Sequence, residues 1–323
     1  MTMADMAQLF SDDLPTARAR FLKACDRIGL RVASFPGRGP APEGAAGALY
    51  CDAARLGSPE ADRMLVICSA ASGGAGFAGA GVAHGVLAAG LMRELPRTVS
   101  CLLIHAVNPL GAVWPPASED PAGETTDPAS SPAAPLKAEW SDGLLSAAEQ
   151  RFSAYERAQR FDREALAGRT LASVAPPAWD AGVQRAIADA HFPGKRRLLF
   201  LDVRTGPGPF GEIERMAPAG PGLGRPEAAQ RWTGLALAGG REGVGETRVR
   251  ASGGLAAFAR DPALEKACVV LEVGAYSIAT LLQAGGPTKG GAVAAYPRDV
   301  IWREQLWDAA SDLIRRGFEG LAG

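Results

Sequence analysis

Two kinds of hydrophobic pattern alternate along the chain: runs of consecutive apolar residues, and segments in which apolar residues recur every three or four positions. The first pattern is typical of strands that a sheet buries on both faces, and the second is typical of amphipathic helices. Strands are predicted at 63–68, 98–107, 197–203 and 268–273. We therefore expect an α/β fold with one mixed, mostly parallel sheet flanked by helices.

Helix positions follow from capping residues and from the spacing of apolar side chains. Asp13 can cap a helix that has Pro15 in its first turn and Phe21 on its apolar stripe. Two short strand-like pieces, RVASFPG and ALYCDAARLG, come next. No internal repeat is visible, so we expect a single domain over 1–323. Further helices are predicted at 83–95, 140–167, 179–191, 278–283 and 299–321.

The segment at 115–135 reads PPASEDPAGETTDPASSPAAP and contains no large apolar residue. A segment of this composition buries too little apolar surface to offset the entropy lost on folding. We therefore predict a flexible, proline-rich loop at 115–135 within the domain.

Charge and composition argue against two function classes. With a formal net charge of −1, the chain has no strong positive field for nucleic acid, and Lys195–Arg197 is interpreted as the solvated end of a strand. No apolar stretch approaches the ~20 residues that cross a bilayer, and the N-terminal residues do not resemble a signal peptide. The five cysteines are isolated from one another, which predicts free, buried thiols. We expect a cytoplasmic protein that binds neither nucleic acid nor membrane.

A glycine-rich turn, CSAASGGAGFAGAG at 68–81, links a predicted strand to a predicted helix. Gly74, Gly76 and Gly79 satisfy the G-x-G-x-x-G spacing that places a dinucleotide phosphate at a helix N-terminus. A dinucleotide site also needs an acidic residue at the end of the second strand to hold the ribose, and this strand ends with His105 and Asn108. Nucleotide binding therefore stays an alternative and not the preferred interpretation.

Ser72 lies in the same turn, in a sequence that approximates the nucleophile elbow of a serine hydrolase. A hydrolase triad needs an acid and then a histidine further along the chain. Asp202 and Glu272 are the best-placed acids, but every histidine precedes them: His84, His105 and His191. The order that serine hydrolases use is therefore absent.

Several segments in order carry a family resemblance: F-S-x-x-x-x-x-A-R-x-R-F near the start, then LYCDAARLG, CSAASGGAGFAGAG, LLIHAVNPLGAVW, LDVRTGPGPFG, LEVGAY and YPRDVIWREQLW. Together they resemble an uncharacterised bacterial branch, a domain of unknown function, of the zinc carboxypeptidase superfamily. The resemblance implies a zinc-carboxypeptidase-like fold with a pocket at the carboxyl ends of the strands.

The resemblance also implies where zinc ligands belong. The family's first turn reads approximately S-G-T-H-G-x-E-G-F-x-G and a later strand ends D-F-H-T-G, with His, Glu and His as ligands. Ser72, Ala75 and Arg204 stand at those positions here. A hydrolytic zinc site needs about three protein donors, and alanine and arginine provide none. We therefore expect no metal cofactor, although zinc is expected of the family.

Glu272 in LEVGAY matches the family's general base. Without a metal, we expect it to form an ion pair with Arg204. The resemblance further implies a pocket lined by Gly73, Gly76, Asn108, Thr205 and Tyr276.

Our preferred interpretation is a degenerate protein without metal or peptidase activity, which binds a small anionic or peptide-like ligand in the former active-site pocket. The alternatives are an amide or ester hydrolase that uses Glu272, with an unusual metal set or with Ser72, and a nucleotide-binding module built on the glycine turn.

Overall fold

The structure is a computed structural model, and it describes residues 8–36, 49–69, 77–107, 109, 178–206, 210–218, 222–239, 255–256, 258–275 and 296–323. The predicted loop at 115–135 and the predicted helices at 140–167 and 278–283 lie outside these residues. In chain order, the elements are α2 (Leu14–Arg27), β1 (Val32–Pro36), β2 (Tyr50–Leu56), β3 (Arg63–Cys68), α3 (Ala78–Ala88), the 3-10 helix η2 (Leu91–Glu94), β4 (Val99–His105), α7 (Ala178–His191), β5 (Arg197–Gly206), β6 (Ile213–Ala217), α8 (Pro226–Thr233), β7 (Ala238–Gly239), β8 (Glu265–Gly274) and α12 (Val300–Ala322).

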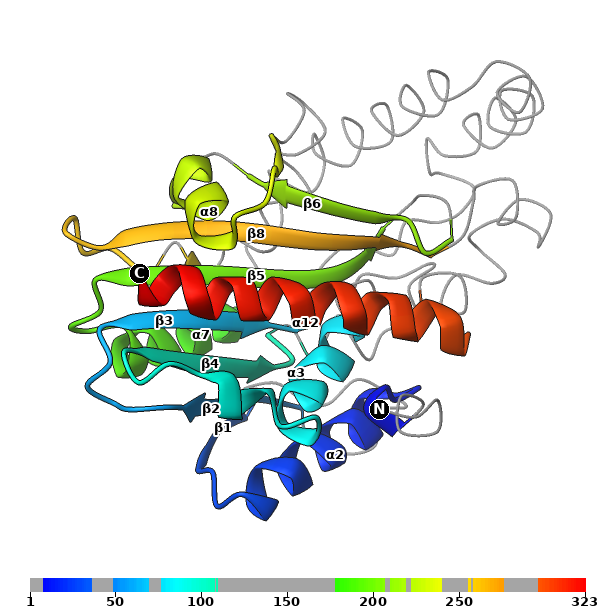
Figure 1. The fold of residues 1–323 in the computed structure, drawn as a ribbon. Helices are drawn as coiled ribbons and strands as arrows, with labels where there is room; N and C mark the ends of the chain where they lie inside the picture. The colour runs from blue at the N-terminus through cyan, green and yellow to red at the C-terminus, as the bar shows by residue number, and fades with distance from the viewer. Residues whose placement is uncertain are drawn as a thin grey trace, which may run out of the picture.

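All the described strands belong to one sheet, in the order β1-β2-β4-β3-β5-β8-β6-β7 (Figure 1). The four central strands, β4, β3, β5 and β8, run parallel to one another. β2 and β6 lie antiparallel on either side of them. The prediction of a mixed, mostly parallel sheet flanked by helices is therefore confirmed, and the carboxyl ends of the four central strands share one edge of the sheet.

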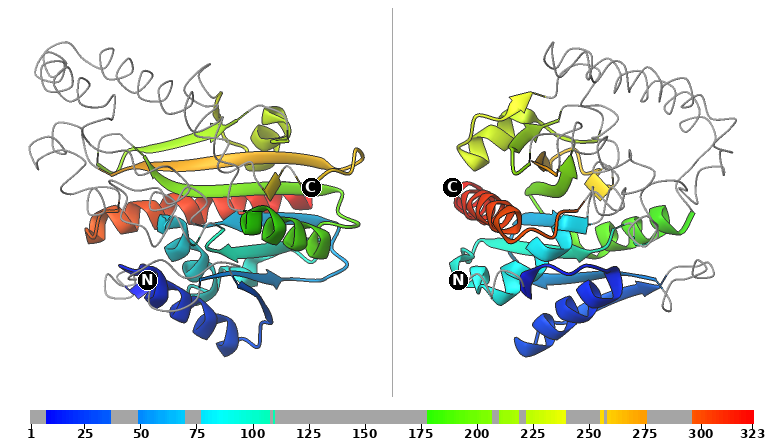
Figure 2. Two further views of the ribbon diagram at one scale, coloured as in Figure 1. Left: turned by 180° about the vertical axis from the view of Figure 1, so that it is seen from behind. Right: turned by 90° about the vertical axis from the view of Figure 1, so that its right-hand side faces the viewer.

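Helices cover both faces of the sheet (Figure 2). On one face, α2, α3, α8 and α12 enclose a large core that includes Phe21, Trp232 and Trp302. On the other face, α7 contributes Val183 and Ile187 to a second, smaller core. Continuous apolar runs in the central strands are explained by this arrangement, because every residue of such a strand meets a core. None of the described helices combines the length and the apolarity that crossing a bilayer requires.

The helix after the glycine turn differs from its prediction. It begins earlier than residue 83 because its first turn packs directly on the end of β3: a Cβ on Gly79 would lie 3.0 Å from Ser69 Cα. It also ends before residue 95, since Gly90 adopts a left-handed φ of 71° and the chain continues as η2. Small residues thus set both the start of α3 and its close contact with the sheet.

The predicted cap at Asp13 is present, and Asp299 caps α12 in the same way. Asp13 Oδ1 accepts a hydrogen bond from Thr16 N at 2.7 Å, and Asp299 Oδ1 accepts one from Trp302 N at 3.0 Å. Each cap satisfies a backbone N–H group that has no partner within its helix.

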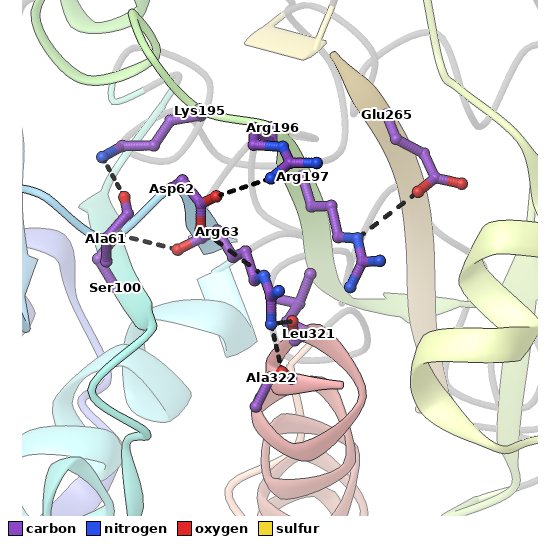
Figure 3. A network of polar contacts seen from close by, with 10 residues as sticks. All are labelled: Ala61, Asp62, Arg63, Ser100, Lys195, Arg196, Arg197, Glu265, Leu321 and Ala322. Atoms are coloured by element: carbon purple, nitrogen blue, oxygen red, sulfur yellow. Dashed lines mark hydrogen bonds and ion pairs between the residues drawn. The ribbon is translucent and has the colours of Figure 1, made fainter. Parts of the chain in front are cut away.

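A polar network joins the amino ends of the central strands to the end of α12 (Figure 3). Arg63 Nη1 donates to Leu321 O at 3.0 Å and also to Ala322 O, so it satisfies carbonyl groups of the last helical turn.

The predicted solvated basic cluster is only partly solvated. Arg196 is exposed and lies 3.7 Å from Asp62, whereas Lys195 is buried and donates to the carbonyl groups of Pro59 and Ala61. The interpretation was wrong for Lys195, because the backbone before β3 provides acceptors for its ammonium group.

Candidate functional site: a buried ion pair at the strand ends

Arg204 and Glu272 come together because β5 and β8 are adjacent parallel strands. The two residues occupy the same register position, near the carboxyl end of each strand. Arg204 Nε donates to Glu272 Oε2 at 3.0 Å, and the side chains are 4% and 5% exposed. The ion pair expected from the sequence is therefore confirmed.

Asp202 supplies a second carboxylate to the same guanidinium. It precedes Arg204 by two residues on β5, so both side chains lie on one face of the sheet. Asp202 Oδ2 is 3.7 Å from Arg204 Nη1, and both side chains are 4% exposed. From the sequence, Asp202 is predicted only as a possible acid of a serine triad. The Asp-x-Arg spacing at the end of a buried strand is the signal that identifies this contact.

The electrostatics of the site are governed by burial. Charged groups removed from water lose hydration, and only close opposite charges and hydrogen bonds offset that loss. Two carboxyl groups, those of Asp202 and Glu272, lie beside one guanidinium here. Glu214, which pairs in register with Glu272 from β6, adds an exposed carboxylate on the same side. The described surroundings of Arg204 are therefore more anionic than cationic.

Two thiols approach this cluster from the sheet. Cys68 is in register with Asp202 on the neighbouring strand. Burial, reinforced by the Asp202 carboxylate, holds the pKa of the Cys68 thiol well above its usual range. Burial also raises the pKa of Cys268 to about 12. Both stay protonated at neutral pH and are therefore poor nucleophiles and metal ligands. All five cysteines are free and buried, as predicted.

Ser69 fixes the loops that leave β3 and β4. Its hydroxyl donates to Ile104 O at 3.0 Å and accepts from Ala106 N at 3.0 Å. Val107 N donates to Ser69 O at 2.9 Å. Ala106 has a φ of 62°, a left-handed conformation that is uncommon for a residue other than glycine. Ser69 thus holds a strained turn immediately before the predicted pocket residue Asn108.

Among the other residues predicted to line the pocket, Thr205 lies in the described part of the chain. Thr205 is buried at the end of β5, and strand alternation directs it to the face that carries Val203, away from Arg204. Its role in lining a pocket stays a prediction. The remaining predicted residues lie outside the described ranges, and their roles stay predictions too: Ser72, Gly73, Gly74, Ala75, Gly76, Asn108 and Tyr276.

A second buried polar cluster lies on the opposite face of the sheet, under α2. Asp52 is fully buried and accepts hydrogen bonds from Arg18 Nε at 2.7 Å, Arg18 Nη2 at 3.1 Å and Ser34 Oγ at 2.5 Å. His105 is in register with Asp52 and stacks on Phe21, with ring centroids 5.2 Å apart. His105 is thus separated from the Arg204–Glu272 pair by the sheet. Arg18 and Asp52 lie in separate segments of the sequence, and no local pattern links them.

The residues at the strand ends do not fit a zinc ion. A guanidinium has five N–H donors, no lone pair to give a metal and a permanent positive charge. Arg204 therefore cannot serve as a ligand, and its contact with Glu272 fills the space that a cation beside that carboxylate would need. Within the described part of the chain, no group of three or more His, Cys, Asp or Glu residues is placed to hold a metal ion.

One family model matches part of the chain. Residues 10–118 match one family model, described as "Protein of unknown function (DUF2817)". The matched segment includes α2, the glycine turn and the Asp52 cluster, and it ends well before Arg204 and Glu272. No curated protein matches the sequence.

Solved structures give distant likenesses. A putative succinylglutamate desuccinylase/aspartoacylase from Shewanella frigidimarina is 16% identical, covers 84% of this chain and 72% of its own, and has a TM-score of 0.35. The glutaminyl cyclase of Macrostomum lignano is 12% identical, with coverages of 99% and 88% and a TM-score of 0.38. The succinylglutamate desuccinylase of Chromobacterium violaceum is 14% identical, with coverages of 90% and 76% and a TM-score of 0.33. At these TM-scores, the likenesses carry no conclusion about activity.

Proposed function

We propose that this protein is a metal-free, catalytically inactive relative of the zinc carboxypeptidase-like hydrolases that binds a small ligand at the carboxyl ends of β5 and β8. The observation that carries the proposal is the buried contact of 3.0 Å between Arg204 and Glu272. A general base must reach the proton that it removes. Here the candidate base is enclosed and hydrogen-bonded to a permanent cation, which argues against hydrolysis through Glu272.

The charges favour a peptide-like ligand over a simple anion. Arg204 already has two carboxylates within 4 Å, those of Glu272 at 3.0 Å and Asp202 at 3.7 Å. A ligand carboxylate placed here would be a third anion around one guanidinium, and like charges in a buried site repel strongly. The amino group of a short peptide would instead meet the exposed carboxylate of Glu214, which lies beside the buried pair.

Zinc content separates this proposal from the hydrolase alternative. After incubation with zinc and gel filtration, we expect elemental analysis to find no zinc above the buffer blank in the unmodified protein. In the triple variant Ser72→His, Ala75→Glu, Arg204→His, which restores the donor types of the family, we expect about one zinc per chain. Arg204→His alone is the matched control. One zinc held by the unmodified protein, or amide or ester turnover abolished by Glu272→Gln, would contradict the proposal.

Ligand class is tested by thermal unfolding at low salt. Glycylglycine amide, which has a cationic amino group and no carboxylate, is expected to raise the melting temperature, because a ligand bound only to the folded state stabilises it. Succinate is expected to leave it unchanged. Glu214→Gln should reduce the effect of the peptide amide, whereas Arg196→Gln, at the amino ends of the strands, should not. A larger shift with succinate would reverse the assignment of ligand class.

A further inference from the structure

A cleft of about 440 Å³ lies at the edge of the sheet opposite the Arg204–Glu272 pair. It opens between the turn after β2 and the segment that joins η2 to β4. Gly57, in the first of these loops, has a left-handed φ of 84°, and a Cβ there would lie 2.9 Å from Leu95 Cδ2 and from Val99 O. The two loops are therefore in close contact at the base of the cleft. The lining residues are Leu56, Gly57, Ser58, Met92, Leu95, Pro96 and Arg97.

The apolar side chains that line the cleft have no aromatic ring, and one lining side chain is a cation. Leu56, Met92, Leu95 and Pro96 are all aliphatic, and Leu56 is buried at 5% exposure. Arg97 is exposed, and no residue in the described part of the chain forms an ion pair with it. Ser58 is already engaged, because its hydroxyl donates to Glu60. Arg97 is therefore the one charged side chain among the lining residues.

We propose that this cleft is a second ligand site, separate from the strand-end site, and that it binds a small aliphatic carboxylate. Its volume falls within the range of about 300 to 1,000 Å³ that is typical of small-molecule pockets. Aliphatic walls match a short hydrocarbon chain, and a guanidinium at the rim matches a carboxylate, which it can bind through two parallel hydrogen bonds. The proposal does not depend on the function assigned to Arg204 and Glu272.

Octanoate is the probe for a direct test by NMR or calorimetric titration. We expect the unmodified protein to bind it with a dissociation constant on the order of 1 mM, as suits a ligand of this size in a partly open cleft. Arg97→Gln should weaken binding roughly fivefold, and added salt should have a similar effect. Arg93→Gln is the matched control, since Arg93 is exposed nearby but does not line the cleft.

Two further measurements identify what the cleft recognises. Octylamine and octanol have the same chain with a different head group, and both should bind more weakly than octanoate. Met92→Trp should block the cleft and abolish octanoate binding while the thermal unfolding transition is kept. Equal binding of octanol and octanoate, equal effects of Arg97→Gln and Arg93→Gln, or no octanoate binding by the unmodified protein would each overturn the proposal.

Discussion

Replacing Arg204 by methionine is expected to lower the free energy of unfolding by about 3 to 5 kcal/mol, the usual cost of removing one partner from a buried ion pair. Methionine keeps much of the side-chain volume, so the loss reports the charge and not a cavity. Asp202 and Glu272, each 5% exposed or less, would remain buried without their shared cation. Urea denaturation at pH 7 measures the difference, provided that the slope of the unfolding free energy against urea concentration is the same for both proteins.

Arg196→Met is the matched control for this prediction. The Arg196 side chain is 80% exposed and lies 3.7 Å from Asp62, so its removal should cost less than about 0.5 kcal/mol. Arg204→Lys keeps the positive charge and should fold even if the methionine variant does not, with a smaller loss. A loss below about 1 kcal/mol for Arg204→Met would show that Asp202 and Glu272 can stay buried in the folded protein without the guanidinium.

A double-mutant cycle assigns the effect to the pair. If Arg204 and Glu272 stabilise each other, the variant with both Arg204→Met and Glu272→Gln should be more stable than the two single losses predict. Coupling of about 1 to 3 kcal/mol is expected for groups in direct contact. Additive losses would mean that each side chain is needed for a reason unrelated to the other.

The central sheet could be predicted because its strands are buried on both faces. Continuous apolar runs such as 63–68 have no other common explanation once glycine-rich turns and helices separate them. The two strands beyond β8 were harder to predict. β6 and β7 are short, and β6 carries Glu214 and Arg215 in an otherwise ordinary segment. β6 is placed by its pairing with β8, and β7 by its pairing with β6, and no local pattern reveals either contact.

The strand-end pair could be anticipated, but the cluster under α2 could not. Arg204 and Glu272 each end a recognisable buried strand, and the carboxyl ends of parallel strands lie at a common edge. Arg18 and Asp52, by contrast, belong to a helix and to an antiparallel strand that are 34 residues apart. Their contact depends on how α2 packs across the sheet, which is a tertiary property.

Acidification is expected to destabilise the protein through His105, which lies in this second cluster. Burial lowers the pKa of His105 from 6.5 to about 4, although the Asp52 carboxylate acts in the opposite direction. In the unfolded chain, the imidazole takes up a proton near pH 6.5, while the folded protein does not until about pH 4. The unfolded state therefore binds more protons in this window, and stability falls as the pH falls. The loss from this one group reaches about 3 kcal/mol near pH 4.

His105→Phe isolates that contribution. Neither ring nitrogen of His105 has a hydrogen-bond partner in the part of the chain that the structure describes. Phenylalanine can therefore keep the stacking on Phe21 without leaving a buried polar group unpaired. Between pH 6.5 and 4, the free energy of unfolding should fall by about 3 kcal/mol less in the variant than in the unmodified protein. The other titrating groups contribute equally to both proteins and cancel in the comparison. His191→Gln, a change at a less buried histidine, should retain most of the original pH dependence. Parallel curves for the His105→Phe variant and the unmodified protein would mean that His105 is protonated in the folded state as readily as in the unfolded chain, and that the cluster under α2 admits water.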